Sequence, residues 1–307
     1  MPDRPTRFKR PTLLIVGCGD VGLRVARLLV GRWRVVALTS SPERMPILRD
    51  AGIVPILGDL DRPATLARLA DLADAVLHLA PPASDGVTDA RTARLVAALA
   101  RSLRVRRLVY GSTTGVYGDC QGARVDETRP LRPASERARR RVDAEARVRW
   151  LGRATGVAVT ILRIPGIYAL DRDGGDPRER VRRGTPLLAT GDDVFTSHIH
   201  ADDLARACAA SLHRGPHQRA INVADDTAMT MGDYFEFVAD RFGLPRPPRL
   251  SRDDAARVLS PMQMSFLSES RRIANARMKD ELRLVLRHLT VVEGLSRVPP
   301  ERGRGGE

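Results

Sequence analysis

Lysine, cysteine and aromatic residues are scarce in this chain of 307 residues. Only two of its 51 basic side chains are lysines, Lys9 and Lys279, so the formal net charge of +14 comes almost entirely from arginine. A nucleic-acid surface needs a concentrated basic stripe with interleaved aromatics, whereas these arginines are scattered and aromatic residues make up 4% of the chain. We therefore attribute the charge to compositional bias and expect no nucleic-acid partner, with a basic nucleic-acid binder as the minor alternative.

The three cysteines also exclude two classes of protein. Cys18, Cys120 and Cys208 are odd in number and far apart, so neither a disulfide framework nor a zinc site is indicated, and we expect a cytoplasmic protein. No apolar run reaches the length of a membrane helix. The first such run, residues 13–16, ends in glycine and is typical of a strand rather than a signal peptide, so we expect no membrane partner.

A glycine-rich turn follows this first apolar run. It reads Gly17-Cys-Gly-Asp-Val-Gly22, a Gly-x-Gly-x-x-Gly pattern, and apolar residues then recur at helical spacing. In such a turn the first glycine permits the tight bend, the second lets the backbone approach a pyrophosphate, and the third lets the helix pack close to the strand. The sequence therefore predicts a dinucleotide site, and the alternative is a turn without a ligand. The predicted cofactor contacts here are Gly17, Gly19, Asp20, Val21 and Gly22.

Strand-like and helix-like runs alternate through the first half of the chain. The strands are expected at residues 34–39, 54–57, 75–79, 107–111 and 157–164, and the helices between them at residues 63–72, 88–102 and 135–155. This alternation predicts an α/β fold, a Rossmann-type doubly wound parallel sheet. Later in the chain we expect a loop at 169–184, helices at 202–212, 231–242 and 275–286, a strand at 221–223 and a stiff linker at 243–249.

This organisation predicts a division of labour along the chain. Residues 8–167 plus 198–226 are expected to form the NAD(P)-binding domain. Residues 168–197 plus 227–298 are expected to form a smaller substrate-side part, and residues 299–307 a disordered tail.

Several further segments occur in the order expected of one enzyme family. Together with the glycine turn they resemble the extended and atypical short-chain dehydrogenase/reductases, the NAD-dependent epimerase/dehydratase family, over nearly the whole chain. The segments are Gly58-Asp59-Leu60, His78-Leu79-Ala80, Tyr110 to Gly118, Leu162 to Tyr168, Ser197 to Ala205, and Ile221-Asn222-Val223. The resemblance implies cofactor contacts from Asp59, Leu60, His78, Leu79, Ala80 and Pro165, and it implies that Thr113 is the catalytic Ser or Thr.

The family's proton-transfer pair, Tyr-x-x-x-Lys, has no counterpart in register. The resemblance places Arg137 and Arg141 at these two positions. Arginine does not deprotonate in proteins and cannot replace a tyrosine base, so the resemblance carries over the cofactor site and not the reaction. We interpret the two arginines as a solvated face on which Arg141 pairs with Glu145 at i+4, the alternative being that Arg141 contacts the cofactor ribose.

Two hydroxyl side chains and two histidines are further candidates. Thr113 either orients a substrate or satisfies a loop amide, and Tyr117 is either a substitute acid or a ring packed under the sheet edge. His198 and His200 alternate along a possible strand and so point the same way. Without a carboxylate or cysteine at ligand spacing, a packed or hydrogen-bonded role is favoured over a metal site, and we expect no metal.

The residues after the second strand bear on which dinucleotide binds. NAD sites place an acidic residue about 20 positions after the glycine turn to hold the ribose 2'-hydroxyl. Here the strand end carries no acid, and hydroxyls and an arginine follow, which suits a 2'-phosphate. Ser41 capping a helix with Pro42 at its first position explains the same residues, and both roles can hold at once. We predict NADP, with NAD as the alternative, bound by Thr39, Ser40, Ser41 and Arg44.

Taken with the resemblance, these motifs predict an NADP(H)-dependent oxidoreductase or epimerase-like enzyme that acts on a small-molecule substrate. The alternative is a catalytically silent dinucleotide-binding sensor or regulatory protein, which would need no substitute for the missing tyrosine and lysine. The identity of the substrate and the formation of a homodimer are left open.

Overall fold

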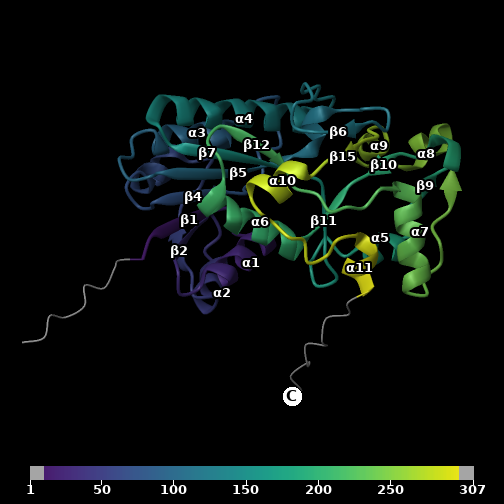
Figure 1. Cartoon of the computed structure of the whole chain (residues 1–307), viewed down its shortest axis with the longest axis horizontal. Helices are drawn as coiled ribbons and strands as arrows, with labels where there is room; N and C mark the ends of the chain where they lie inside the picture. Colours follow the sequence, from purple (N-terminus) through teal and green to yellow (C-terminus); the bar gives the residue numbers. More distant parts are fainter. Residues whose placement is uncertain (1–9, 297–307) are drawn as a thin grey trace, which may run out of the picture.

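In a computed structural model that describes residues 10–296, seven parallel strands form one sheet in the order β12-β7-β5-β4-β1-β2-β3 (Figure 1). Their bounds are Thr12–Val16 (β1), Arg34–Thr39 (β2), Val54–Leu57 (β3), Ala75–His78 (β4), Arg107–Thr113 (β5), Ala158–Ile164 (β7) and Arg219–Asn222 (β12). The chain adds β2 and β3 on one side of β1 and then returns to add β4 on the other. Ligands of such sheets bind at the carboxyl ends of the strands near this reversal. The predicted Rossmann-type α/β sheet is confirmed.

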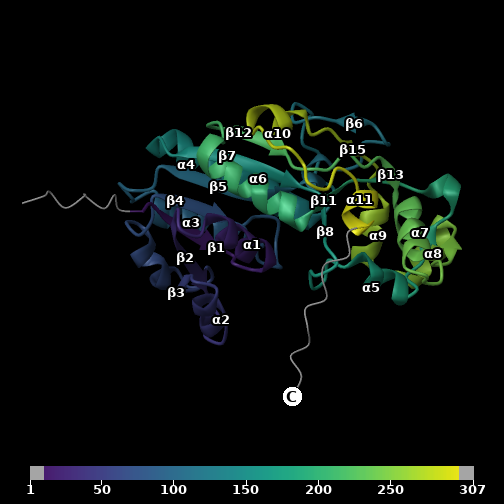
Figure 2. The same cartoon turned by 60° about the horizontal axis from the view of Figure 1, so that its bottom comes forward.

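Helices cover both faces of this sheet (Figure 2). One face carries the 3₁₀ helix Pro63–Leu69 (η1), α3 (Ala90–Leu99) and α4 (Glu136–Thr155), and the opposite face carries α1 (Asp20–Leu29), α2 (Arg44–Asp50) and α6 (Ala201–Arg214). The ends of α4 are set by its sequence. Ser135 accepts a hydrogen bond from the amide of Ala138 at the start, and Gly156 adopts the left-handed conformation at the end.

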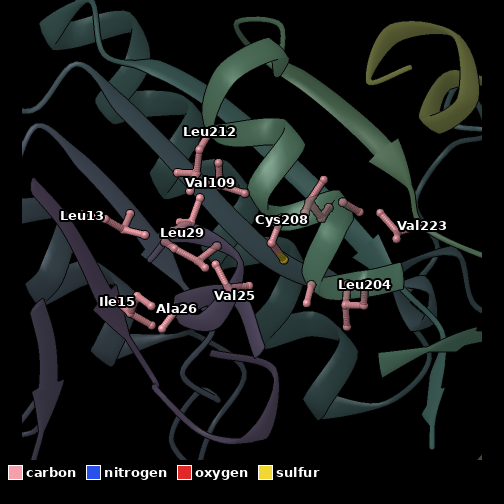
Figure 3. Packing of buried hydrophobic residues seen from close by; sticks show 14 of the residues in the cluster. Leu13, Ile15, Val25, Ala26, Leu29, Val109, Leu204, Cys208, Leu212 and Val223 are labelled. Carbon is pink, nitrogen blue, oxygen red and sulfur yellow. The ribbon is translucent and has the colours of Figure 1, made fainter. Parts of the chain in front are cut away.

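The core on the α1 and α6 face shows why these segments are helical. Val25 and Leu29 lie one turn apart on α1, and Leu204, Cys208 and Leu212 lie at the same spacing on α6 (Figure 3). Both stripes pack on the apolar side chains of the sheet. A third contribution comes from much later in the chain, because Met278, Leu282, Leu284 and Leu286 belong to the same cluster as Leu13. Residues 276–286, which the sequence places in the substrate-side part, thus contribute four side chains to the core beside the sheet.

A smaller region follows β7 and has a core of its own. Its elements are β8 (Gly166–Tyr168), α5 (Pro177–Arg182), β9 (Leu187–Leu188), η3 (Thr190–Asp192), β10 (Phe195–Thr196), β11 (His198–His200), β13 (Met229–Thr230), α7 (Met231–Arg241), β14 (Arg249–Leu250), α8 (Arg252–Val258), α9 (Pro261–Leu267), β15 (Arg272–Ile273) and α11 (Val291–Ser296). The helix α10 (Ala276–Glu281) follows β15 and packs on the sheet through Met278. The 3₁₀ helix η2 (Thr114–Tyr117) and β6 (Arg124–Val125) leave the sheet domain toward it, and β6 pairs with β15.

Several sequence-based boundaries are wrong in this region. The loop expected at 169–184 contains α5, which Asp176 caps by accepting from the amide of Arg178. The helix expected at 275–286 ends at Glu281, and Arg283 beyond it has φ 51°. Helices α8 and α9 were not expected, because each spans only seven residues and short helices depend on tertiary packing. The tail predicted at 299–307 lies outside the described residues.

None of the helices within residues 10–296 has both the length and the apolar character needed to cross a membrane.

Candidate dinucleotide and substrate sites

Two cavities open along the carboxyl edge of the sheet. The first, of about 370 Å³, is lined by residues that follow β1, β2, β3 and β4, and we call it the dinucleotide cavity. The second, of about 880 Å³, is lined by residues at the ends of β5 and β7 and by the smaller region, and we call it the substrate cavity. Both therefore occupy the position at which α/β sheets bind their ligands.

The glycine turn has the geometry that a pyrophosphate site requires. Gly17 has φ +89°, and a Cβ atom there would lie 2.3 Å from the backbone nitrogen of Ala80, so only glycine fits. A Cβ atom on Gly19 would meet nothing within 4 Å, which leaves open space beside the backbone. A Cβ atom on Gly22 would lie 3.2 Å from Cys18 Sγ, because α1 packs closely against β1. The residues present fit a dinucleotide.

The structure brings most of the predicted cofactor residues into the dinucleotide cavity. Those that line it are Gly17, Gly19, Thr39, Ser40, Ser41, Arg44, Asp59, Leu60, Leu79 and Ala80. Pro165 lines the substrate cavity instead, whereas Asp20, Val21, Gly22 and His78 line neither cavity. Seven further lining residues were not predicted, Val16, Cys18, Leu38, Leu48, Gly58, Pro81 and Arg91. Five of them are direct neighbours of predicted residues, whereas Leu48 comes from α2 and Arg91 from α3, where neither carries a local signal.

Asp20 and His78 are turned toward structural partners. The Asp20 carboxylate lies 3.1 Å from Arg24 and 3.3 Å from Arg172, and buried Arg24 also binds Asp202 of α6. His78 Nε2 lies 2.8 Å from Thr92 Oγ1 on α3. Burial lowers the pKa of His78 to about 4, so its imidazole is neutral at pH 7.

Arg44 reaches from the first turn of α2 to the glycine turn. Its Nη2 atom donates a hydrogen bond to the carbonyl oxygen of Cys18 at 2.8 Å. The predicted capping role of Ser41 is wrong, because Pro42 and Glu43 form a turn first, the helix begins at Arg44, and no side chain caps it. The backbone amide of Ser41 instead donates to Thr39 Oγ1 at 3.2 Å.

Thr113 ends β5 at the wall of the substrate cavity. Its Oγ1 atom accepts a hydrogen bond from the amide of Gly115 at 3.2 Å, and Thr113, Thr114 and Gly115 all line the cavity. The hydroxyl therefore satisfies a loop amide, as the local alternative predicts, while Thr113 also forms part of the cavity wall. Its O–H group can still donate a hydrogen bond.

Tyr117 lies away from both cavities. Its side chain is buried, its hydroxyl donates to Asn222 Oδ1 at 2.7 Å, and it accepts from Arg163 Nη1 at 2.9 Å. Burial raises the pKa of Tyr117 above its usual range. Tyr117 is therefore a packed ring, as the alternative interpretation predicts, and it does not line the substrate cavity with Thr113.

Arg137 and Arg141 line the substrate cavity from α4. The Arg137 guanidinium lies 4.5 Å from the centre of the Phe266 ring, and Arg141 Nη1 donates to Tyr110 Oη and to the Gly111 carbonyl, each at 3.0 Å. Glu145 instead binds Arg163 of β7, with the two side chains 2.8 Å apart in the interior. The predicted Arg141–Glu145 pair is therefore wrong, because Glu145 faces the sheet and meets a buried cation there. Arg137 is exposed, as the interpretation of a solvated face predicts, whereas Arg141 is half-buried.

The two predicted histidines are packed in different surroundings. His198 lines the substrate cavity and lies 4.1 Å from Tyr234, ring centre to ring centre, and burial lowers its pKa to about 3. His200 stacks on His288 at 3.7 Å, and burial lowers its pKa to about 4. A carboxylate oxygen of Asp202 lies within 4.8 Å of a ring nitrogen of His200 and of His288, and the sequence did not predict this group of three residues. Arg24 holds that carboxylate at 2.5 Å, so a cation already occupies it.

Comparison with known proteins identifies the family. A model of the NAD dependent epimerase/dehydratase family matches residues 13–224. This chain belongs to that family. It is 31% identical over 242 residues to protein YeeZ of Escherichia coli strain K12, covering 76% of this chain and 84% of that protein.

Solved structures of other proteins share the fold of this chain. A functionally unknown conserved protein from Silicibacter pomeroyi DSS superposes with a TM-score of 0.78 at 33% identity, covering 93% of this chain and 97% of that one. A double mutant of DesIV, a dTDP-glucose 4,6-dehydratase from Streptomyces venezuelae with NAD and DAU bound, superposes with a TM-score of 0.76 at 21% identity, covering 93% and 94%. At that identity the second likeness shows the fold alone.

Membership of the epimerase/dehydratase family does not specify a reaction, so the polar residues that line the substrate cavity are considered next. Besides Thr113, the polar groups on its wall include Ser135, Ser197, His198 and Tyr234. Tyr234 comes from α7 and was missed, because no local pattern distinguishes it from a core aromatic. Burial raises the pKa of Tyr234 far above its usual range, which makes it a hydrogen-bond donor rather than a base at neutral pH.

Proposed function

We propose that this chain binds NADP(H) at the carboxyl edge of its sheet and acts as an oxidoreductase or epimerase-like enzyme on a small molecule in the substrate cavity. The observation that carries the proposal is the glycine turn, with open space at Gly19 and the Arg44 guanidinium beside it. The proposed contacts of the dinucleotide are the predicted residues that line its cavity, together with Pro165, which directly follows β7 and lines the substrate cavity. When bound, the cofactor supplies hydride transfer at its nicotinamide ring.

The proposed preference for NADP(H) rests on Ser40, Ser41 and Arg44. These residues line the dinucleotide cavity after β2, where Asp59 is the one carboxylate among the described lining residues. A guanidinium and hydroxyls suit a phosphate through charge-assisted hydrogen bonds. Losing such a bond typically weakens binding by about tenfold or more.

Calorimetric titration of NADPH and NADH tests this preference. We expect NADPH to bind more tightly, and Arg44→Ala to weaken NADPH binding by about tenfold while leaving NADH binding nearly unchanged. Arg49→Ala is the matched control, because Arg49 is an exposed arginine on the same helix outside the cavity. Equal affinities for the two cofactors, or no loss in Arg44→Ala, would refute the 2'-phosphate assignment.

For the substrate side, we propose that Thr113 orients a carbonyl or hydroxyl group of the substrate. Tyr117 takes no part, since its hydroxyl is buried between Asn222 and Arg163, so the proton comes from solvent or from the substrate itself. Without a positioned acid and base the enzyme forgoes about 10²- to 10⁴-fold of rate. Thr113→Val should lower kcat with little change in cofactor affinity, and full activity of that variant would remove Thr113 from the site.

A catalytically silent dinucleotide sensor is the second candidate function. It is favoured by the buried, fully bonded hydroxyl of Tyr117 and by arginine at both positions that the resemblance assigns to the proton-transfer pair. Cofactor binding without turnover over a broad panel of alcohols, ketones and sugar derivatives would support the sensor. Turnover of any of these compounds would favour the enzyme.

A further inference from the structure

Arginine side chains crowd the substrate cavity. Six arginines and three carboxylates are among the described residues that line it. They are Arg137, Arg141, Arg172, Arg180, Arg183 and Arg271, with Asp176, Glu179 and Glu269. We propose that the molecule bound here carries a phosphate or carboxylate group, which Arg137 and Arg141 of α4 and Arg180 of α5 hold near Thr113. The inference rests on the proposed function only in taking this cavity as the substrate site.

The carboxylates of the cavity wall are largely used by other partners. Glu269 lies 2.6 Å from Arg271, and Asp176 lies 2.7 Å from Arg178, which does not line the cavity. Arg172 in turn lies 3.3 Å from Asp20. These pairs neutralise one another, and Glu179 is then the one remaining carboxylate among the described lining residues, against four arginines, Arg137, Arg141, Arg180 and Arg183.

Arg137, Arg141 and Arg180 have no carboxylate within 4.0 Å among residues 10–296. Aromatic faces hold two of them instead, because Arg137 lies over Phe266 and Arg180 over Phe235, each 4.5 Å from the ring centre. Nε and Nη2 of Arg180 are buried without a hydrogen-bond partner. The positive charge of Arg180 is therefore desolvated without a carboxylate partner at the cavity wall, and an anion in the cavity would balance it.

The compositional bias toward arginine does not explain this arrangement. Within the described part of the chain the three most buried arginines are Arg24, Arg140 and Arg163, and each lies within 4.0 Å of a carboxylate. These three most buried arginines are therefore paired with carboxylates, whereas Arg137, Arg141 and Arg180 face the substrate cavity without one. Arg137 and Arg141 are four residues apart on one helix and so present one face, while Arg180 belongs to a different helix. A planar guanidinium fork matches both phosphate and carboxylate oxygens.

The test is a calorimetric titration of inorganic phosphate, and separately of malonate, into the full chain saturated with NADP⁺. Saturation keeps either anion away from the glycine turn, so remaining binding reports the substrate cavity. We expect saturable binding of at least one anion, weakened at least about tenfold in an Arg137→Gln, Arg180→Gln double variant. The stronger of the two anions identifies the group as phosphate or carboxylate.

Arg139→Gln is the matched control, because Arg139 is an exposed arginine on α4 that does not line the cavity. It should bind both anions as the unaltered protein does, and Arg141→Lys, which keeps the charge, should lose less than Arg141→Gln. No saturable binding of either anion, or an equal loss in Arg139→Gln, overturns the proposal. If NADP⁺ itself does not bind, the proposed function fails, and the same titrations without NADP⁺ still decide the anion site.

Discussion

The dinucleotide cavity is walled by short segments that directly follow β1 to β4, whereas the substrate cavity draws its wall from β5, α4, α5, α7 and α9. Backbone and small side chains form much of the first, and the second is formed by long side chains such as Arg137, Arg180 and Phe266. A site formed by backbone depends on a few glycines at fixed spacing. A site formed by side chains depends on packing between segments far apart in sequence, so the two cavities should respond differently to substitution.

The largest expected effect is the loss of dinucleotide binding in Gly19→Val. The side chain would occupy the open space beside the glycine turn without a clash inside the protein, so binding should fall by about 100-fold or more while the fold persists. Titration of NADPH together with thermal unfolding measures both quantities.

Gly191→Val is the control from the smaller region. A Cβ atom on Gly191 also meets nothing within 4 Å, and this glycine lines neither cavity. It should leave NADPH binding unchanged. Retained NADPH binding in Gly19→Val would show that the glycine turn does not face the cofactor. The dinucleotide cavity would then not depend on its glycines in the way that we infer.

The next largest effect is expected beneath the substrate cavity, in Glu145→Ala. Glu145 lies 2.8 Å from Arg163 in the interior and accepts a hydrogen bond from Ser112 Oγ at 2.7 Å. Removing one partner of a buried ion pair leaves the other charge uncompensated and typically costs about 3–5 kcal/mol. Urea unfolding should show a loss of this size in the free energy of unfolding.

An exposed pair provides the comparison. Arg257 lies 2.9 Å from Asp254 on α8, and its side chain is 75% exposed, so Arg257→Ala should change the free energy of unfolding by less than about 1 kcal/mol. Similar losses in the two variants would mean that the buried pair does not support β5 and β7.

The smallest effect concerns pH and Asp225, which lies behind the wall of the substrate cavity. Burial raises the pKa of this carboxyl from 3.8 to about 7, and its backbone amide donates to the carbonyl of His198. Between these two pH values the folded protein keeps a proton that the unfolded chain releases. The contribution of Asp225 to stability is therefore full at acid pH and falls as the pH rises to 7.

Asp225→Asn should remove this dependence. One pKa unit corresponds to about 1.4 kcal/mol, and because buried carboxyls relax we expect the variant to gain roughly 2 kcal/mol relative to the unaltered protein between pH 4 and pH 8. Urea unfolding across this range measures the difference. A difference that stays constant with pH would show that Asp225 titrates normally.

Most of the dinucleotide cavity could be predicted because the sequence patterns that specify it are local. The strands 34–39 and 54–57 were expected with the bounds that they have, since both are short runs between breakers. The glycine turn specifies its own backbone, and the residues after each strand follow from the parallel sheet. Arg91 escaped this reasoning because it reaches the cavity from α3.

The wall of the substrate cavity could not be predicted in the same way. Helical spacing pairs Arg141 with Glu145, but the actual partner of Glu145 is Arg163, a residue of another element. Arg180 stands in a segment rich in glycine, aspartate and arginine, which resembles a loop until Asp176 is seen to cap it. The two errors have different physical causes. The spacing of residues within one element does not reveal which charge another element brings to it, and composition alone does not distinguish a short capped helix from a loop.

The packing of residues 276–286 on the sheet has a consequence for synthesis. Leu13 of β1 leaves the ribosome early, whereas Met278 and Leu286 of the same apolar cluster are added more than 260 residues later. Until then this side of the nascent sheet lacks part of its cover, and such exposed apolar surface attracts chaperones or other unfinished chains. Completion of this cluster therefore waits for almost the whole chain, although the glycine turn beside it is translated within the first 22 residues.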